Sequence, residues 1–189
     1  MPKFEVQDEY LELIDNPNKV NNTYDFLIAL CQKGFKNLNL KRGSEEHKKY
    51  TDRIYYELDI LKELGFVDYI LLVWKVIHFC NTSDIPVGLG RGSAAGSFVL
   101  YLLGVTKIDT VKYDLFFERF VSKIRAKKKV VDGVTYLDGS LMCDIDMDVC
   151  YYKRKNVLKY LEQEFKGKTS KIRTLNTLSG KLVMKECGK

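Results

Sequence analysis

A short acidic run carries the clearest chemical signal in this sequence. Residues 143–149 read CDIDMDV, so carboxylates alternate with apolar side chains. On a strand, this period of two places Asp144, Asp146 and Asp148 on one face and the apolar residues against the core. Three neighbouring carboxylates repel one another unless a cation compensates them, and two divalent ions about 4 Å apart would do so and would serve in-line phosphoryl transfer. Oxygen ligands favour Mg²⁺ or Mn²⁺ over zinc. A charged edge strand is the alternative.

A glycine-rich segment, residues 88–97, is the second candidate for chemistry. It reads GLGRGSAAGS and contains neither a Walker Gly-Lys-Ser/Thr nor the full dinucleotide-binding fingerprint. If a helix begins near Ser93, the free backbone N–H groups of its first turn would point into the loop. Together with the Arg91 guanidinium and the hydroxyls of Ser93 and Ser97, they would form a cradle for phosphate. A tight turn with close helix packing, which glycine permits, explains the same residues.

Periodicity and glycine positions predict the elements that must position these residues. Helices are expected over 23–33, closed by Gly34, over 45–64, closed by Gly65, and over 67–80. A strand-like piece over 85–87, the glycine loop and a helix over 98–103 follow. Two β-rich arms around Asp132-Gly133 predict a hairpin, and residues 141–150 predict another strand. A helix over 151–165, a strand near 172–175 and a helix from about residue 177 complete the chain.

Composition and charge restrict the class of protein. Hydrophobic residues make up 46% and charged residues 30% of the 189 residues, which excludes a disordered chain. The net charge is +6, and residues 119–189 hold 17 basic and 8 acidic residues. This excess suits a polyanionic partner, although a solvated lysine-rich surface explains it equally well. The sequence has five cysteines and no C-x-x-C pair, so neither a zinc site nor a disulfide framework is expected. Reduced thiols indicate a location in the cytosol. Neither a signal peptide nor a membrane span is expected.

Four blocks of the sequence together resemble the C-family replicative DNA polymerases, the family of the bacterial or phage DNA polymerase III alpha subunits. The blocks are GF at 65–66 with YILLVW at 69–74, IPVGLGRGSAAGS at 85–97, YDLFFERF at 113–120 and DIDMD at 144–148. Arg154, Tyr160, Ile172 and residues 174–177 match further downstream. The resemblance runs in order from about residue 23 to the end.

This resemblance implies an α+β fold, a polymerase-beta-like nucleotidyltransferase palm with a mixed sheet and flanking helices. The palm would be incomplete and preceded by an N-terminal helical segment. Residues 1–22 would form a lead-in, 23–84 the helical part of the palm, 85–177 the palm core and 178–189 the start of a thumb. The palm core would contain a hairpin insertion at about 123–141 and the acidic strand 143–149.

The resemblance also implies roles for individual residues. Asp146 and Asp148 would hold two catalytic Mg²⁺ or Mn²⁺ ions, with Asp144 in support. The residues expected to contact the incoming dNTP are Arg91, Gly92, Ser93, Gly96 and Ser97. Catalysis would position a primer 3′-hydroxyl against an α-phosphate and stabilise the developing charge. Additional contacts with primer–template DNA are expected from Lys127, Lys128, Lys129, Lys153 and Arg154.

The sequence departs from the family in three respects. Cys143 stands where the family usually has proline. The 22 residues between Phe120 and Cys143 are a longer connection than in the family. We also expect the chain to lack the family's N-terminal phosphoesterase-like domain, its fingers, most of its thumb and its third catalytic aspartate. Activity is therefore expected to need a C-terminal polymerase polypeptide. Replisome subunits are expected as further partners in the cytoplasm of a bacterial cell, whether the chain is encoded by the host or by a phage.

Two other hypotheses remain open. In the first, the chain is a catalytically inactive fragment that binds DNA or the replisome. Its DNA binding would then depend on salt concentration but not on Mg²⁺. In the second, the chain would be a minimal nucleotidyltransferase for a small substrate if it turned over substrate alone, with Glu118 or another nearby acidic residue as a third metal ligand.

Overall fold

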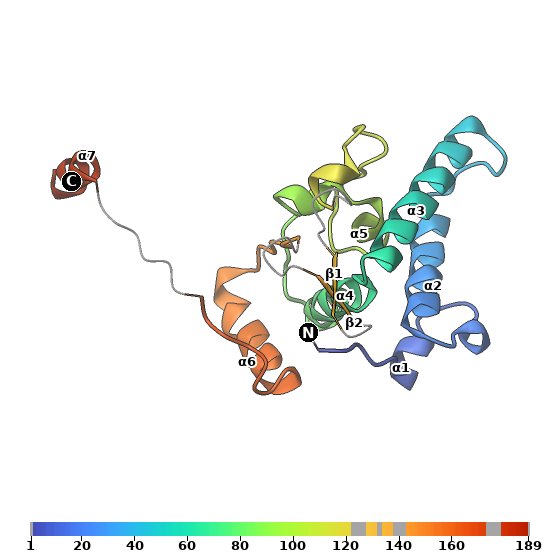
Figure 1. Cartoon of the computed structure of the whole chain (residues 1–189), viewed down its shortest axis with the longest axis horizontal. Coiled ribbons are helices and arrows are strands. Elements are labelled where there is room, and N and C mark those ends of the chain that lie inside the picture. Colours follow the sequence, from blue (N-terminus) through green and yellow to red (C-terminus); the bar gives the residue numbers. More distant parts are fainter. Residues whose placement is uncertain (1, 122–127, 132–133, 138–142, 173–178, 189) are drawn as a thin grey trace.

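A computed structural model describes residues 2–121, 128–131, 134–137, 143–172 and 179–188 (Figure 1). The helices are α1 (Asp8–Leu11), α2 (Thr23–Lys36), α3 (Glu45–Glu63), α4 (Val67–Thr82), α5 (Phe98–Leu102), α6 (Arg154–Glu164) and α7 (Gly180–Cys187). Short 3-10 turns lie at Pro17–Lys19, Ser93–Gly96, Phe117–Arg119 and Tyr151–Lys153. The strands are β1 (Lys128–Val131) and β2 (Val134–Leu137).

The expected mixed-sheet palm is wrong. Over the residues that the structure describes, the only sheet is the antiparallel β1–β2 hairpin, and the other elements are helices and turns. The acidic segment 143–149 forms no named strand, because its backbone pairs with a neighbour only at the isolated bridge between Val87 and Val149. Alternating apolar side chains need a surface to pack on, and here the helical core supplies that surface without a sheet.

The predicted hairpin itself is confirmed. Val131 pairs with Val134, and the register continues to Lys128 opposite Leu137. The Asp132-Gly133 turn lies outside the described residues, as do residues 173–178, which include most of the strand expected near 172–175.

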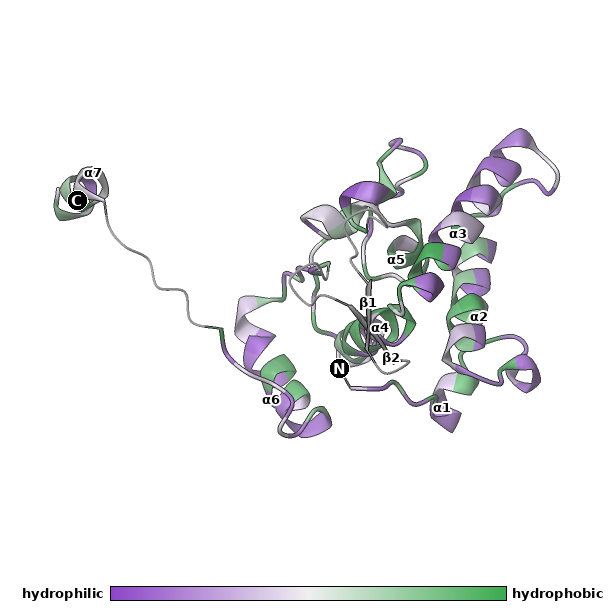
Figure 2. Ribbon diagram, viewed as in Figure 1, coloured by the Kyte–Doolittle hydropathy of each residue, from purple (hydrophilic) through white to green (hydrophobic). Residues whose placement is uncertain are grey.

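The predicted helices α3 and α4 are confirmed, and their ends follow from local chemistry. The side chain of Ser44 caps α3 by accepting from the backbone N–H of His47 at 3.1 Å. Gly65, with a φ of +70°, provides the left-handed residue that ends α3. Figure 2 shows the contrast between the two helices: α4 is largely hydrophobic, whereas the first turns of α3 are hydrophilic.

Gly34 does not close α2, which continues to Lys36. A Cβ atom at Gly34 would lie 2.2 Å from the carbonyl oxygen of Leu102 at the end of α5. The glycine therefore marks a close approach of two helix backbones, which explains its position inside a helix.

One hydrophobic core lies among α2, α3, α4 and α5. Its fully buried side chains include Phe26, Leu27, Leu61, Ile70, Leu71, Phe98, Leu100 and Phe117. The lead-in over 1–22 contributes Phe4, Tyr10 and Ile14 to this core, and the ring of Tyr10 meets Trp74 edge-on at 5.2 Å. Helix α6 confirms the helix predicted there and packs on the outer side of α4, where Tyr160 stacks on Phe79 at 3.8 Å.

Candidate functional site

The tertiary structure brings the acidic segment next to the beginning of the glycine loop. The backbone N–H of Gly88 donates to the carbonyl of Asp148 at 2.8 Å, and that of Cys150 donates to the carbonyl of Pro86 at 3.0 Å. The apolar residues Ile145, Met147 and Val149 pack against the core, as their alternation predicted. The two segments singled out from the sequence therefore form one site.

Arg91 lies between the two carboxylates expected to hold metal. Its Nη2 atom is 3.4 Å from Asp146 Oδ1, and its Nε atom is 3.2 Å from Asp148 Oδ1. The three side chains are 58%, 40% and 64% exposed, so the site is open to solvent. Within the described part of the chain, no group of three or more His, Cys, Asp or Glu side chains is arranged to hold a metal ion.

Two glycines allow the loop to approach the acidic segment. A Cβ atom at Gly88 would lie 3.0 Å from the Cβ of Asp148. Gly92 has a φ of +66°, and a Cβ there would lie 3.3 Å from Asp146 Oδ2. Because L side chains rarely adopt such a φ, the loop needs glycine at this position.

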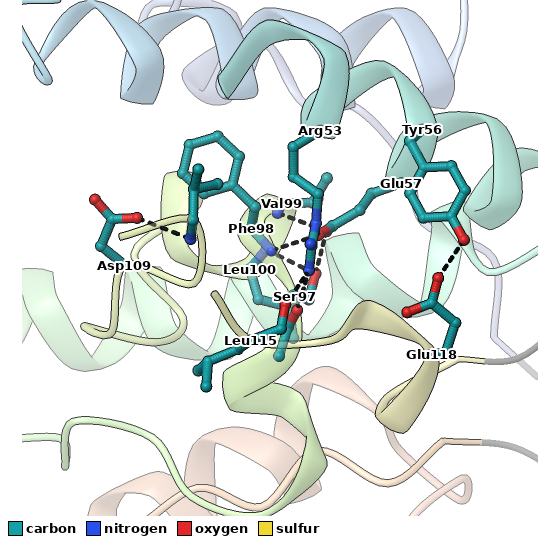
Figure 3. A network of polar contacts seen from close by, with 12 residues as sticks. Arg53, Tyr56, Glu57, Ser97, Phe98, Val99, Leu100, Asp109, Leu115 and Glu118 are labelled. Atoms are coloured by element: carbon teal, nitrogen blue, oxygen red, sulfur yellow. Dashed lines mark hydrogen bonds and ion pairs between the residues drawn. The ribbon is translucent and has the colours of Figure 1, made fainter. Parts of the chain in front are cut away.

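The end of the loop differs from the predicted phosphate cradle. Residues Ser93–Gly96 form a 3-10 turn, and α5 begins only at Phe98, with Ser97 as its N-cap. The backbone N–H groups of Phe98 and Val99 donate to the carboxylate of Glu57 at 2.9 and 3.0 Å (Figure 3). The α-helix expected to begin near Ser93 therefore begins at Phe98, and the N–H groups of its first turn already have an anionic partner.

The predicted nucleotide contacts consequently fall into two groups. Arg91 and Gly92 are exposed and Ser93 is half-buried, whereas Gly96 and Ser97 are buried. The Ser97 hydroxyl donates to Glu57 Oε2 at 2.8 Å and accepts from the backbone N–H of Leu100 at 3.3 Å.

Sequence reasoning missed Glu57 and its partner Arg53. The signal was present, because Glu57 falls within the apolar stripe of α3 and has an arginine one turn before it. Burial raises the pKa of Glu57, and the hydrogen bonds from Arg53, Val99 and Phe98 offset only part of that rise.

The other residues predicted from the sequence, Asp144 and the basic residues expected to contact DNA, lie in different segments of the chain. Asp144 is exposed. Lys153 donates to the carbonyl of Asp84 and lies 3.3 Å from Asp84 Oδ2, and the exposed Arg154 begins α6. Lys128 and Lys129 lie on β1, and Lys127 lies outside the described residues.

The pKa values of Tyr69, beside the acidic segment, and of Glu118, beside Tyr56 on α3, are both shifted. Burial raises the pKa of Tyr69 to about 12, and Cys143, Asp144 and Asp146 add to this rise. Glu118, the alternative third ligand, accepts a hydrogen bond from the Tyr56 hydroxyl, and this bond lowers the pKa of Glu118.

No helix in the described ranges combines the length and apolar character needed to cross a membrane.

Comparison with known proteins gives a consistent family. The sequence model described as the bacterial DNA polymerase III alpha NTPase domain matches residues 25–189. DNA polymerase III subunit alpha of Borreliella burgdorferi is 37% identical over 171 residues, which cover 90% of this chain and 13% of that protein. The same subunit of Haemophilus influenzae is 33% identical over 175 residues, 89% of this chain and 14% of the relative. That of Halalkalibacterium halodurans is 31% identical over 190 residues, 100% of this chain and 14% of the relative. The chain thus spans 13–14% of the length of these relatives.

Proposed function

The chain belongs to the family of the bacterial DNA polymerase III alpha NTPase domain, and on that premise we propose that it supplies part of the nucleotidyl-transfer site of a replicative DNA polymerase. The observation that carries this proposal is Arg91 seated between Asp146 and Asp148. Transfer of a nucleotide needs carboxylates for divalent ions and a cation for the triphosphate, and these three side chains provide both.

Asp146 and Asp148 would hold the divalent ions. Their donor set fits such ions, because both carboxylates are partly exposed and turn toward the same positive group. Oxygen ligands of this kind suit Mg²⁺ or Mn²⁺. The bound ions would stabilise the attacking and leaving oxygens of the displacement. Asp144, exposed and two residues earlier, would add negative charge in support.

Arg91 would bind the phosphates of the incoming dNTP. A guanidinium makes paired, charge-assisted hydrogen bonds to phosphate oxygens. Gly92 and Ser93 follow on the accessible part of the loop, where the absence of a side chain at Gly92 leaves room beside Asp146. We assign Gly96 and Ser97 an indirect part, because both are buried and Ser97 bonds to Glu57.

Primer–template DNA would be the nucleic-acid partner. A C-terminal polymerase polypeptide would supply the third carboxylate, and the complex would act in the bacterial cytoplasm. Lys153 and Arg154 follow the acidic segment after three intervening residues, and β1 adds Lys128 and Lys129. Such cations neutralise backbone phosphates and make binding dependent on salt.

Primer extension tests this function. The 189-residue chain is mixed with the C-terminal part of the polymerase, primer–template DNA, dNTPs and Mg²⁺. We expect extension by the mixture and a loss of about 100-fold or more in Asp146→Asn and Asp148→Asn. Asp52→Asn, the same change at an exposed position on α3, serves as the matched control and should retain activity. Unchanged extension in Asp146→Asn, or no extension by the wild-type mixture, would refute the proposal.

A second candidate function, DNA or replisome binding without catalysis, is favoured by one feature of the same site. Arg91 already compensates the two carboxylates, so their proximity does not by itself require metal. This function predicts salt-sensitive DNA binding that is unaffected by Mg²⁺ and by Asp148→Asn. Mn²⁺ titration followed by electron paramagnetic resonance separates the two functions, because only the first expects Mn²⁺ bound through Asp146 and Asp148.

A further inference from the structure

A completely buried carboxylate lies beneath the glycine loop. Glu57, on α3, has no solvent exposure. Its Oε1 atom accepts from Arg53 Nε at 2.6 Å and from the backbone N–H of Phe98 at 2.9 Å. Its Oε2 atom accepts from Ser97 Oγ at 2.8 Å and from the backbone N–H of Val99 at 3.0 Å. Figure 3 shows these donors converging on one side chain from both α3 and the start of α5.

Arg53 extends this network to a third segment. Its Nη2 atom donates to the carbonyl of Gly96 at 2.9 Å and to the carbonyl of Leu115 at 2.8 Å. The segment after Leu115 closes over the loop so tightly that a Cβ atom at Gly96 would lie 2.7 Å from the carbonyl oxygen of Phe116. One ion pair thus joins α3, the end of the glycine loop and the chain before Phe117.

A buried ion pair is by itself weak evidence for a stabilising role. Two charges taken out of water lose their hydration, and apolar residues of similar volume often stabilise a core as well as an ion pair does. What the pair provides in addition is direction, because a carboxylate and a guanidinium accept and donate at fixed angles.

The other end of the loop is also held. The backbone of Gly88 bonds to Asp148, as described above, and the carbonyl of Leu89 accepts from the backbone N–H of Lys107 at 2.8 Å. Arg91 therefore lies on a short arch between two fixed ends. The first end is fixed by the acidic segment, and the second by Glu57 and Arg53.

We propose that Arg53 and Glu57 are positioning residues that fix the end of the glycine loop so that Arg91 faces Asp146 and Asp148. This role rests on the proposed function, since it concerns the geometry of the same site. Neither residue needs to touch the nucleotide, because the effect passes through Gly96, Ser97 and the backbone before them.

Nuclear magnetic resonance of the Arg91 side chain tests the role without any nucleotide. The Nε atom of Arg91 lies 3.2 Å from Asp148 Oδ1, so its N–H resonance reports this contact. In Glu57→Gln, an amide N–H₂ group would face the existing donors. We expect the Arg91 Nε–H resonance to move toward that of a free side chain. We also expect the amide protons of residues 92–97 to exchange at least about 10-fold faster.

Two further variants separate positioning from general stability. Ile14→Ala removes a buried side chain in the lead-in, and at a temperature giving the same folded fraction it should leave the Arg91 resonance unchanged. The double variant Arg53→Met/Glu57→Met removes both charges together. It also leaves the N–H groups of Phe98 and Val99 without their acceptor, so it too is compared at a temperature giving the same folded fraction as the wild type. Positioning predicts a displaced Arg91 resonance in this folded protein. A wild-type resonance in the double variant would refute the role.

Nucleotide binding keeps the two proposals distinguishable. With Mn²⁺ present, Glu57→Gln should raise the Kd for a dNTP at least about 10-fold, whereas Ile14→Ala should not. A wild-type chain that binds no dNTP, together with an Arg91 resonance that responds to Glu57→Gln, would refute the proposed function and support the positioning role. A chain that binds dNTP but whose Arg91 resonance does not change in Glu57→Gln would support the proposed function and refute the positioning role.

Discussion

Replacing Arg91 with alanine should change two affinities of the site in opposite directions. In the free protein, the guanidinium neutralises Asp146 and Asp148, so a divalent ion must displace it before binding both carboxylates. During nucleotide binding, the same guanidinium would hold phosphate. Arg91→Ala therefore removes a competitor of the metal and a ligand of the nucleotide.

The size of each effect follows from the exposure of the three side chains. All are at least 40% exposed, and exposed ion pairs contribute about 0.2–1 kcal/mol each. Loss of two such pairs should tighten Mn²⁺ binding roughly 2- to 30-fold. A hydrogen bond to a charged group contributes about 1.5–3 kcal/mol, so dNTP binding should weaken roughly 10- to 150-fold.

Mn²⁺ affinity is measured by electron paramagnetic resonance without nucleotide, and dNTP affinity by calorimetry at saturating Mn²⁺. Arg42→Ala, which removes the same charge from an exposed position outside the site, should alter neither affinity by more than about 2-fold. Arg91→Lys keeps the positive charge but loses the planar guanidinium, so its affinities for Mn²⁺ and dNTP should lie between those of the wild type and Arg91→Ala. Weaker Mn²⁺ binding in Arg91→Ala, or an unchanged dNTP affinity, would show that the reasoning is wrong.

Two further predictions concern packing. Gly34→Ala should gain about 1 kcal/mol in helix propensity but lose more through the 2.2 Å approach to Leu102, so thermal unfolding should occur about 2–8 °C lower. Gly180→Ala, in α7, is the control: nothing lies within 4 Å of the added Cβ atom, so this change should not lower the melting temperature. A melting temperature of Gly34→Ala equal to or above that of the wild type would contradict the close approach. Burial raises the pKa of Cys31, so this thiol should react with a disulfide reagent at pH 8 much more slowly than the exposed Cys187. Mass spectrometry of the labelled peptides checks this order, and similar rates in the folded chain would contradict the burial of Cys31.

Local chemistry explains what could be predicted along the chain. The cap at Ser44, the apolar stripe of α3 and the left-handed Gly65 all act within a few residues, so the limits of that helix are present in the sequence. The hairpin around Asp132-Gly133 follows from similar short-range preferences.

The errors arise where a local pattern has two tertiary solutions. Alternation in residues 143–149 predicted a strand of a mixed sheet, but it is satisfied by an extended segment on a helical core. Gly34 resembled a helix stop, but it serves a backbone contact with Leu102, distant in sequence. A helix beginning near Ser93 was expected to leave N–H groups free for phosphate, but the α-helix begins at Phe98 and its first N–H groups bond to Glu57, about 40 residues earlier.

The sequence by itself determined the three long helices α2, α3 and α4 apart from the end of α2, the membership of the family and the two segments that carry the chemistry. These properties depend on residue types and short spacings. Only the tertiary structure decided that Arg91 meets Asp146 and Asp148, and that Glu57 and Arg53 hold the end of the loop. Those contacts join residues about 40 to 60 positions apart, and their energies arise from burial and hydrogen-bond geometry, which exist only once the core has formed.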